Sequence, residues 1–292
     1  MKTIASTSEL RSSLAQHRRE GKTIAFVPTM GNLHAGHIEL VRNARNQADI
    51  VVVSIFVNPM QFGANEDLDN YPRTLTADKE KLFAEGTQYL FFPSAKEIYP
   101  GGMENQTRVS VPELADTLCG SSRPGHFTGV ATVVSKLFNI VQPDQAFFGK
   151  KDFQQLAIIK KMVADLCIPV DVIGIDTARA KDGLALSSRN GYLNKQERQS
   201  APLLQQQLQQ CAEAISMGNT DFEVLEQQAR EALTSAGFSP DYFQVCDAYT
   251  LHPPSTHSTE LVIATAARLG STRLIDNITV TLNPSQKHGH SH

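Results

Sequence analysis

Short apolar runs that alternate with segments of helical period constrain the fold of this chain most strongly. The runs are TIAFV, IVVVSIFV, QYLFFP, QAFF and VDVIGI, at residues 23–27, 50–57, 88–93, 145–148 and 170–175. Between them lie segments such as HIELVRNARNQA and FQQLAIIKKMVADL, in which apolar residues recur every three or four positions. This alternation predicts repeated βαβ units, with a parallel sheet covered by helices on both faces. Right-handed crossovers place the strand-to-helix turns at one edge of such a sheet, where these folds bind ligands.

The pattern changes after about residue 176. A loop-like stretch, TARAKDGLALSSRNGYL, precedes two helical segments rich in Gln and Glu, at 195–217 and 221–236. The strand-like segments FQVCDA, ELVIATAARL and RLIDNITVTL follow, and helices followed by strands predict a small α+β domain. We therefore expect a Rossmann-like domain over 1–176, a smaller α+β domain over 177–283, and a disordered His-containing tail over 284–292.

Composition and charge exclude several classes of partner. The 27 Lys and Arg residues against 30 Asp and Glu give a formal charge of -3, so no basic field exists to attract a nucleic-acid backbone. The four cysteines are widely separated and form no CxxC pair, which argues against a zinc knuckle or a disulfide framework. The N-terminus lacks the apolar segment of a signal peptide, and the longest apolar run is far shorter than the roughly 20 residues that span a bilayer. The sequence predicts a cytoplasmic protein without membrane or nucleic-acid partners.

The stretch PTMGNLHAGH, residues 28–37, lies between the first apolar run and a helical segment. A phosphate site needs helix N-terminal N–H groups and glycines that allow close approach, here Gly31 and Gly36. His34 and His37 are three positions apart, so they share one face if the helix begins near them, where imidazoles can stabilise charge during attack at phosphorus. The stretch matches neither the P-loop nor the GxGxxG pattern. The alternative is a polar turn in which one histidine caps the helix and the other is a surface residue, but the position after a strand favours the phosphate site.

PTMGNLHAGH resembles the HxGH signature of the nucleotidylyl transferase superfamily, which also contains the class I aminoacyl-tRNA synthetases. The chain as a whole resembles the pantothenate synthetase (pantoate–β-alanine ligase) family. The resemblance continues through SIFVNPMQF, YPRTL, SRPGHFTGV, FFGKKDFQQL, RAKDGLALSSRNGYL and LIDN, and it covers nearly everything except the His-containing tail. Several collinear motifs are far more specific than HxGH alone. The resemblance implies that the domain over 1–176 binds nucleotide and pantoate, and that the domain over 177–283 closes over ATP.

Side-chain amides follow the second predicted strand, in FVNPMQF. Asn58 and Gln61 should lie at the same sheet edge as His34 and His37. Amides suit a small hydroxy acid because they offer donors and an acceptor without a charge that would repel ATP. The resemblance implies that Gln61 contacts pantoate and β-alanine, and that Gln155 contacts pantoate. For Asn58, a substrate contact and a buried structural amide remain equal alternatives.

Two further motifs carry residues suited to ATP. In FFGKKDFQQL, Lys151 can reach a phosphate and Asp152 suits a helix cap or a ribose contact. In KDGLALSSRNGYL, two glycines bracket hydroxyls and a guanidinium, as expected of a loop that closes over a polyphosphate. The resemblance assigns this loop, a backbone contact near Ala178 and the Gly149–Asp152 turn to ATP. Lys150 stands where the family pattern has an acidic residue, and a solvated surface lysine is the favoured interpretation there.

The predicted site is therefore large. The residues expected to bind ATP are Met30, Gly31, Asn32, Leu33, His34, Ala35, Gly36, His37, Gly149, Lys150, Lys151, Asp152, Ala178, Leu186, Ser187, Ser188 and Arg189. The residues expected to act in catalysis are His34, His37, Lys151, Ser187, Ser188 and Arg189, and those for pantoate and β-alanine are Gln61, Gln155 and Asn58. Mg²⁺ is expected with ATP, but its protein ligands are not identified. Asp78 is expected to be a solvated helical residue rather than a metal ligand, and the roles of Arg123 and His126 in SRPGHFTGV stay open.

An HxGH site favours activation of a carboxylic acid as an acyl adenylate. The resemblance implies ATP-dependent condensation of (R)-pantoate with β-alanine to pantothenate, through a pantoyl adenylate, with release of AMP and pyrophosphate. It also implies a homodimer. The enzymatic alternative is a nucleotidyltransferase acting on a phosphorylated acceptor, which would require more Arg or Lys than the neutral amides offer. A non-catalytic module that senses nucleotide is the other alternative.

Overall fold

The computed structural model describes residues 1–64 and 66–282, which form two compact units. The first unit contains Met1–Asp116, Arg123–Lys150 and Gln155–Ala178. The second contains Thr117–Ser122, Lys151–Gln154 and, of the described residues, 179–282. The predicted disordered tail lies outside the described residues. The assignment of separate binding tasks to the two units stays a prediction.

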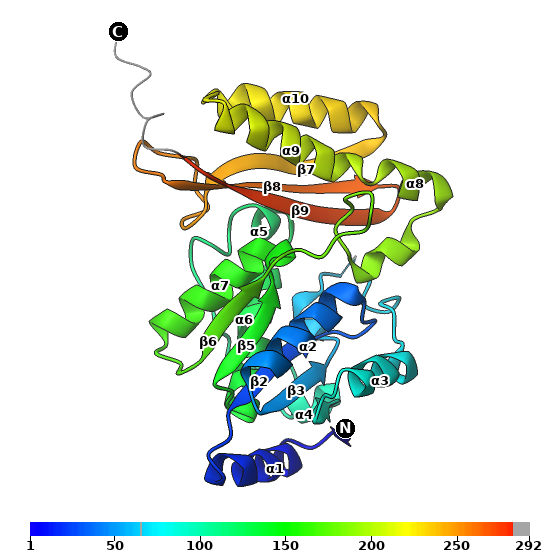
Figure 1. Ribbon diagram of the computed structural model, residues 1–292, viewed down its shortest axis with the longest axis vertical. Coiled ribbons are helices and arrows are strands. Elements are labelled where there is room, and N and C mark those ends of the chain that lie inside the picture. Colours follow the sequence, from blue (N-terminus) through cyan, green and yellow to red (C-terminus); the bar gives the residue numbers. More distant parts are fainter. Residues whose placement is uncertain (65, 283–292) are drawn as a thin grey trace. The chain divides into compact units, whose positions relative to one another are not determined.

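A six-stranded parallel sheet forms the centre of the first unit (Figure 1). Its order is β1-β4-β3-β2-β5-β6, and every neighbouring pair is parallel. The strands are β1 (Lys2–Ile4), β2 (Ile24–Thr29), β3 (Ile50–Ile55), β4 (Tyr89–Phe91), β5 (Gln145–Gly149) and β6 (Asp171–Ile175). The predicted Rossmann-like α/β class is confirmed. Sequence periodicity missed β1, because a three-residue edge strand with one buried residue has no apolar run.

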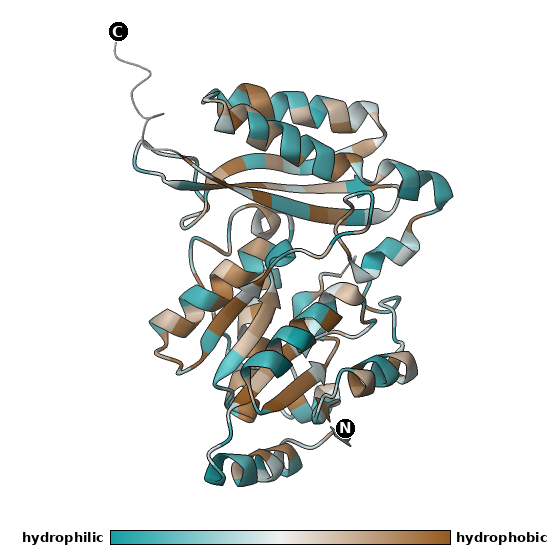
Figure 2. Cartoon of the chain, viewed as in Figure 1, coloured by the Kyte–Doolittle hydropathy of each residue, from teal (hydrophilic) through white to brown (hydrophobic). Residues whose placement is uncertain are grey.

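Helices cover both faces of this sheet. Those of the first unit are α1 (Thr7–Arg19), α2 (Ala35–Gln47), α3 (Leu75–Ala84), α4 (Ala95–Ile98), α6 (His126–Val141) and α7 (Phe153–Asp165), the last of which begins in the segment assigned to the second unit. Successive strand residues point to opposite faces. Val27 joins a core cluster with Val41 of α2, whereas Phe26 packs edge-on against Phe138 of α6, with ring centroids 6.4 Å apart. The central strands β2 and β3 are therefore buried on both sides, and their apolar residues are brown in Figure 2.

The strand order reverses between β2 and β5. From β2 the chain adds β3 and β4 on one side, and then returns to place β5 and β6 on the other side of β2. The pairing of β2 with β3 extends to Thr29, but its pairing with β5 ends at Phe26. Ligands of open parallel sheets bind at such a reversal, outside the carboxyl ends of the strands. The motifs PTMGNLHAGH and FGKKD begin in the last two residues of these strands and continue beyond their carboxyl ends.

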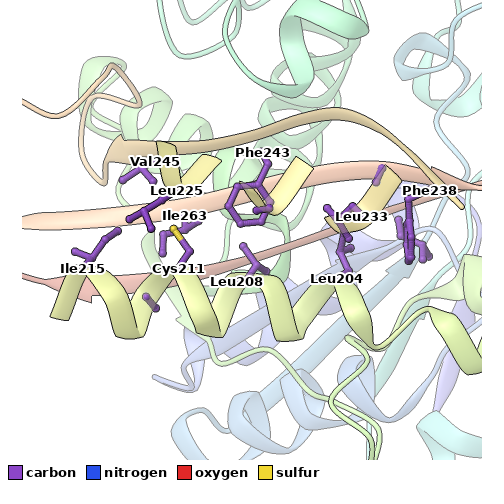
Figure 3. Packing of buried hydrophobic residues seen from close by; sticks show 14 of the residues in the cluster. Leu204, Leu208, Cys211, Ile215, Leu225, Leu233, Phe238, Phe243, Val245 and Ile263 are labelled. Atoms are coloured by element: carbon purple, nitrogen blue, oxygen red, sulfur yellow. The ribbon is translucent and has the colours of Figure 1, made fainter. Parts of the chain in front are cut away.

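The second unit is a three-stranded antiparallel sheet packed against two long helices. The strands lie in the order β7-β8-β9, and α9 packs against β8 and β9 while α10 packs against β7. Figure 3 shows apolar side chains of α9, including Leu204 and Leu208, directed toward Phe243 and other sheet residues. The elements are α5 (Cys119–Ser122), α8 (Lys195–Ser200), α9 (Leu203–Ser216), α10 (Phe222–Ser235), β7 (Phe238–Asp247), β8 (Glu260–Leu269) and β9 (Thr272–Thr281).

Two boundaries in this unit differ from the sequence expectation, and a proline explains each. The helix expected over 195–217 is divided into α8 and α9 at Pro202, which lacks the N–H needed to continue a helix. The strand expected at FQVCDA begins earlier, at Phe238. Pro240 obscured that start, but β7 is an edge strand with a register shift between Pro240 and Tyr242, and such places tolerate proline.

None of the helices in the described ranges combines the length and the apolar character needed to cross a bilayer.

Burial in the parallel sheet predicts a large difference between two phenylalanine substitutions. Phe147 of β5 is 0% exposed, whereas Phe83 of α3 is 70% exposed. We expect Phe147→Ala to lower the free energy of unfolding by about 3–5 kcal/mol, because it removes buried contacts and leaves a cavity. Phe83→Ala should stay within about 0.5 kcal/mol of the wild type. Urea unfolding of the full chain measures both, and equal losses would contradict the assigned core.

Candidate functional site

The loop between β2 and α2 makes a tight reversal. Gly31 and Asn32 both have left-handed backbone conformations, with φ of 83° and 49°. A Cβ on Gly31 would lie 3.0 Å from Cγ2 of Ile55 and 3.3 Å from Oδ2 of Asp78. Glycine is therefore required here both for its backbone conformation and for the close packing of the loop.

Both histidines of the HxGH motif cap α2. His34 is the N-cap residue, and its Nδ1 accepts a hydrogen bond from the Gly36 amide at 3.1 Å. The Nδ1 atom of His37 accepts one from the backbone amide of His34 at 3.2 Å, which completes a capping box. A nitrogen that accepts carries no proton, so each neutral ring holds its proton on Nε2. Neither histidine is the uninvolved surface residue of the alternative interpretation.

Gly36 allows the His34 ring to fold over the first turn of α2. A Cβ at position 36 would lie 2.9 Å from Cε1 of His34, closer than carbon atoms normally approach. It would also lie 3.5 Å from Cβ of Ala178. Ala178, predicted to contact ATP, therefore lies beside the HxGH turn within the first unit.

Two residues of α3 hold the loop that precedes His34. The Asp78 carboxylate accepts hydrogen bonds from the amides of Asn32 and Leu33, at 2.9 and 2.8 Å. Lys81 donates from Nζ to the Leu33 carbonyl at 2.6 Å. Asp78 is 0% exposed, so the expectation of a solvated helical residue was wrong. Its spacing of three residues from Lys81 is compatible with a shared helix face, but the partner segment lies 45 residues away and has no signal in the sequence.

Asn58 is a fully satisfied buried amide. Its Nδ2 donates to Gln61 Oε1 at 3.0 Å and to the Gly129 carbonyl at 3.2 Å. Its Oδ1 accepts from the Tyr99 hydroxyl at 2.7 Å and from the Met60 amide at 3.3 Å. Burial raises the pKa of Tyr99, so the phenol stays protonated as a donor. Of the two alternatives for Asn58, this geometry favours the structural amide.

The bond from Asn58 fixes the orientation of the Gln61 amide. Gln61 ends the 3₁₀ turn η1 (Pro59–Gln61), which follows β3 at the carboxyl edge of the sheet. Because Oε1 faces Asn58, the Nε2 end of the amide lies on the side of Met30, 3.5 Å from its sulfur. Met30 and Gln61, predicted to contact different substrates, therefore lie next to each other in the first unit.

The predicted residues after β5 lie in the 3₁₀ turn η2 (Lys150–Asp152) and the start of α7. Lys150 forms an exposed ion pair with Asp176 at 2.7 Å, which favours the surface interpretation for Lys150. The Lys151 side chain is only 17% exposed, and its Nζ lies 3.7 Å from Oδ1 of Asp152. Gln155 is half-buried in the first turn of α7.

The predicted mobile loop begins with a capped turn in the second unit. Ser187 caps the 3₁₀ turn η3 (Ser188–Tyr192) by accepting a hydrogen bond from the Arg189 amide at 3.2 Å. Asn190 donates to the Ala185 carbonyl at 3.0 Å, which holds the two ends of the segment together. Leu186 to Arg189 are all partly exposed.

A network on β9 joins this loop to the turn after β5. Arg179 makes two bonds to the Asp276 carboxylate, at 2.6 and 2.9 Å, and one to the Gly183 carbonyl at 3.1 Å. Asn277 donates from Nδ2 to the Lys151 carbonyl at 2.8 Å. The Asp276 side chain is 2% exposed. Two segments predicted to contact ATP are thus fixed to neighbouring residues of β9. Asp276 and Asn277 lie in the LIDN motif, for which the sequence alone indicates no role.

The described residues contain no group of three or more His, Cys, Asp or Glu side chains that could hold a metal ion.

Asp78 and Lys81 of α3 together form a clamp on the loop before His34. This clamp predicts the effect of replacing Asp78 with asparagine. One carboxylate oxygen becomes an NH₂ group, which must face the amide of Asn32 or Leu33 as a second donor. We expect Asp78→Asn to cost about 1–3 kcal/mol of stability and to speed hydrogen exchange at these two amides. Glu80→Gln, on an exposed position of the same helix, is the matched control and should change neither. Unchanged exchange at Leu33 in Asp78→Asn would show that the clamp does not hold the loop.

Comparisons with known proteins agree over nearly the whole chain. The family model for pantoate-beta-alanine ligase matches residues 2–279. The pantothenate synthetase of Marinobacter nauticus is 59% identical over 281 residues, which cover 96% of this chain and 100% of that protein. The pantothenate synthetase of Pseudomonas putida is 59% identical over 283 residues, covering 97% and 99%.

Solved structures agree as well. The crystal structure of pantothenate synthetase from Thermus thermophilus matches with a TM-score of 0.89 and 43% identity, over 95% of this chain and 99% of that one. A pantoate-beta-alanine ligase from Francisella tularensis, complexed with beta-gamma ATP and beta-alanine, matches with a TM-score of 0.80 and 36% identity, over 95% and 97%. With a family model and relatives that extend over almost its full length, this chain belongs to the pantoate–β-alanine ligase (pantothenate synthetase) family of enzymes.

Proposed function

We propose that this chain condenses (R)-pantoate with β-alanine, at the expense of ATP, to give pantothenate, AMP and pyrophosphate. Family membership supports the ligase reaction, and the names of the relatives support pantothenate as its product. The Francisella tularensis relative was crystallised with an ATP compound and β-alanine, which supports these two as substrates here.

The capped HxGH turn is the observation that favours an adenylate intermediate. A carboxylate can be activated by ATP as an acyl phosphate or as an acyl adenylate. The turn presents two imidazoles at the N-terminus of α2, each with its proton on Nε2, at the reversal of strand order. Helix N-termini and N–H donors stabilise negative charge at phosphorus, and this supports attack on the nucleotide within the HxGH turn.

The reaction then runs in two steps. A carboxylate oxygen of pantoate attacks the α-phosphorus of ATP, the bond to the bridging oxygen breaks, and pyrophosphate leaves with the electron pair. In the second step the neutral amine of β-alanine attacks the carbonyl carbon of the pantoyl adenylate. The carbon–oxygen bond to AMP breaks, the amine loses a proton to solvent, and the amide of pantothenate remains. No covalent bond to the protein is required.

Six side chains are proposed to stabilise the charge that develops in the first step. They are His34, His37, Lys151, Ser187, Ser188 and Arg189. The burial of Lys151 and the capped start of the Ser187 turn support defined positions for these groups. The other residues predicted for ATP are proposed to contact it as substrate, except that Lys150, with its exposed ion pair, is the weakest of them. Mg²⁺ is proposed to enter with ATP, bound to the phosphate oxygens.

The acceptor side of the site is proposed to use two glutamine amides. Gln61 would present its Nε2 donors to pantoate and β-alanine, because Oε1 is occupied by Asn58. Gln155 is proposed to contact pantoate. Asn58 is proposed to act through Gln61 rather than by touching substrate, since its hydrogen bonds are satisfied by protein groups. A cytoplasmic homodimer is proposed as the working form, and the family resemblance supports the dimer.

The proposed function is tested by measuring AMP and pyrophosphate release with pantoate or β-alanine omitted in turn. We expect both products to require pantoate, and sustained turnover to require β-alanine as well. A nucleotidyltransferase acting on a phosphorylated acceptor would release pyrophosphate without AMP. A binding module would leave ATP unchanged in the complete mixture. Either of these results would reject the proposed reaction.

Two substitutions separate the capping role of His37 from its proposed catalytic role. His37→Asn places an amide oxygen near the position of Nδ1, so it can still accept from the His34 amide, but it removes Nε2. His37→Ala removes both groups. We expect both variants to slow adenylate formation by roughly 10²- to 10³-fold, with ATP affinity changed only a few-fold. Single-turnover kinetics and equilibrium ATP binding measure the two effects, and wild-type rates in His37→Asn would reduce His37 to a helix cap.

A further inference from the structure

The segment Gly125–Gly129, with the sequence GHFTG, begins α6 and packs against the backbone that carries Gln61. A Cβ on Gly129 would lie 2.5 Å from the Met60 carbonyl oxygen, 2.7 Å from its carbon and 2.8 Å from Cα of Gln61. All three are backbone atoms, which cannot rotate away as a side chain can. Only glycine allows this approach, and the Gly129 carbonyl also accepts the Asn58 amide that orients Gln61.

His126, in the first turn of α6, forms a hydrogen bond with the backbone of Gln61. Its Nδ1 lies 2.8 Å from the Gln61 carbonyl oxygen, and its Nε2 lies 3.0 Å from Nη1 of Arg123. A guanidinium can only donate, so Nε2 must accept and the ring proton must be on Nδ1. His126 is therefore a neutral Nδ1–H imidazole that donates to Gln61, the opposite tautomer from the two HxGH histidines.

A partly buried ion pair fixes the guanidinium that sets this tautomer. Arg123 bonds Glu66 through Nε at 2.5 Å and through Nη2 at 2.7 Å, which leaves Nη1 directed at His126. Burial alone would raise the pKa of Glu66, but the hydrogen bonds and positive charge of Arg123, together with the hydrogen bond from the Gly63 amide, lower it to about 2. The carboxylate therefore stays charged at neutral pH, and the planar fork of Arg123 stays in one orientation.

Three contacts converge on Gln61: His126 on its carbonyl, Gly129 on its Cα, and Asn58, itself bonded to Gly129, on its Oε1. We propose that the GHFTG segment is a positioning platform for Gln61, and that His126 and Gly129 determine how well the enzyme binds pantoate without touching it. This rests on the proposed function for its substrate, and it gives SRPGHFTGV a role that the sequence left open. If a group that positions substrate is displaced by about 1 Å, the reaction can slow by roughly a hundredfold.

A pair of isosteric substitutions tests the platform. The amide nitrogen of His126→Asn lies near the position of Nδ1 and can still donate to Gln61, whereas the amide of His126→Gln lies near Nε2 and cannot. We expect the pantoate KM of His126→Asn to stay within a few-fold of wild type, and that of His126→Gln to rise about tenfold or more, with the ATP KM nearly unchanged. Gly129→Ala should raise the pantoate KM roughly a hundredfold. Equal KM values in the two His126 variants, or a normal KM in Gly129→Ala, would overturn the platform.

A second measurement does not depend on activity. Nitrogen-15 NMR of the histidine rings, with the His126 signals assigned by their loss in His126→Asn, should show the Nδ1–H tautomer at neutral pH. Hydrogen exchange at the backbone N–H of Gln61 should be faster in His126→Gln and Gly129→Ala than in His126→Asn. An Nε2–H ring, or equal exchange in all three variants, would reject the platform. Failure of the wild type to make pantothenate would reject the proposed function instead, and these two readouts would still decide the platform.

Discussion

The N-terminus of α2 leaves backbone N–H groups that need acceptors, and this chain supplies them from imidazoles. Serine or aspartate would cap equally well but would offer a phosphate no N–H donor from the side chain. His34 and His37 use Nδ1 for the cap and keep the proton on Nε2. The same two side chains thus fix the start of α2 and carry the N–H groups that are proposed to bind an anion there. The proposed chemistry depends on this division of the two ring nitrogens.

Elements behind the site hold the residues that are proposed to face substrate. On one side Asp78 and Lys81 of α3 bond the loop before His34, and on the other α6 supports Gln61 through Gly129 and His126. The second unit repeats this design, since Asn277 of β9 holds the backbone of the Lys151 turn. In each case a backbone carbonyl or amide is the contact point. Precise placement of catalytic groups requires such support, because a side chain is only as well placed as its backbone.

Much of the fold and the position of the candidate site could be predicted from sequence, because periodicity and strand-end motifs are local signals. The apolar runs gave β2 to β6, and the motifs after β2, β3 and β5 were placed correctly at strand ends. The errors about polar side chains arose where distant segments meet. Asp78 looked solvated because its partner amides lie 45 and 46 residues away. Asn58 could not be assigned until Tyr99 and Gly129 were seen to bond it. Periodicity identifies buried faces, but it does not identify polar partners across the fold.

The adenylate is the central claim, and the fate of a carboxylate oxygen tests it most directly. Pantoate labelled with ¹⁸O in its carboxylate should be converted with unlabelled ATP and β-alanine, and the phosphorus products analysed by mass spectrometry. If the carboxylate attacks the α-phosphorus within the HxGH turn, the oxygen that bonded to phosphorus leaves with the nucleotide, and AMP carries one labelled oxygen. Label in inorganic phosphate, with ADP as the nucleotide product, would show an acyl phosphate and contradict the role assigned to His34 and His37.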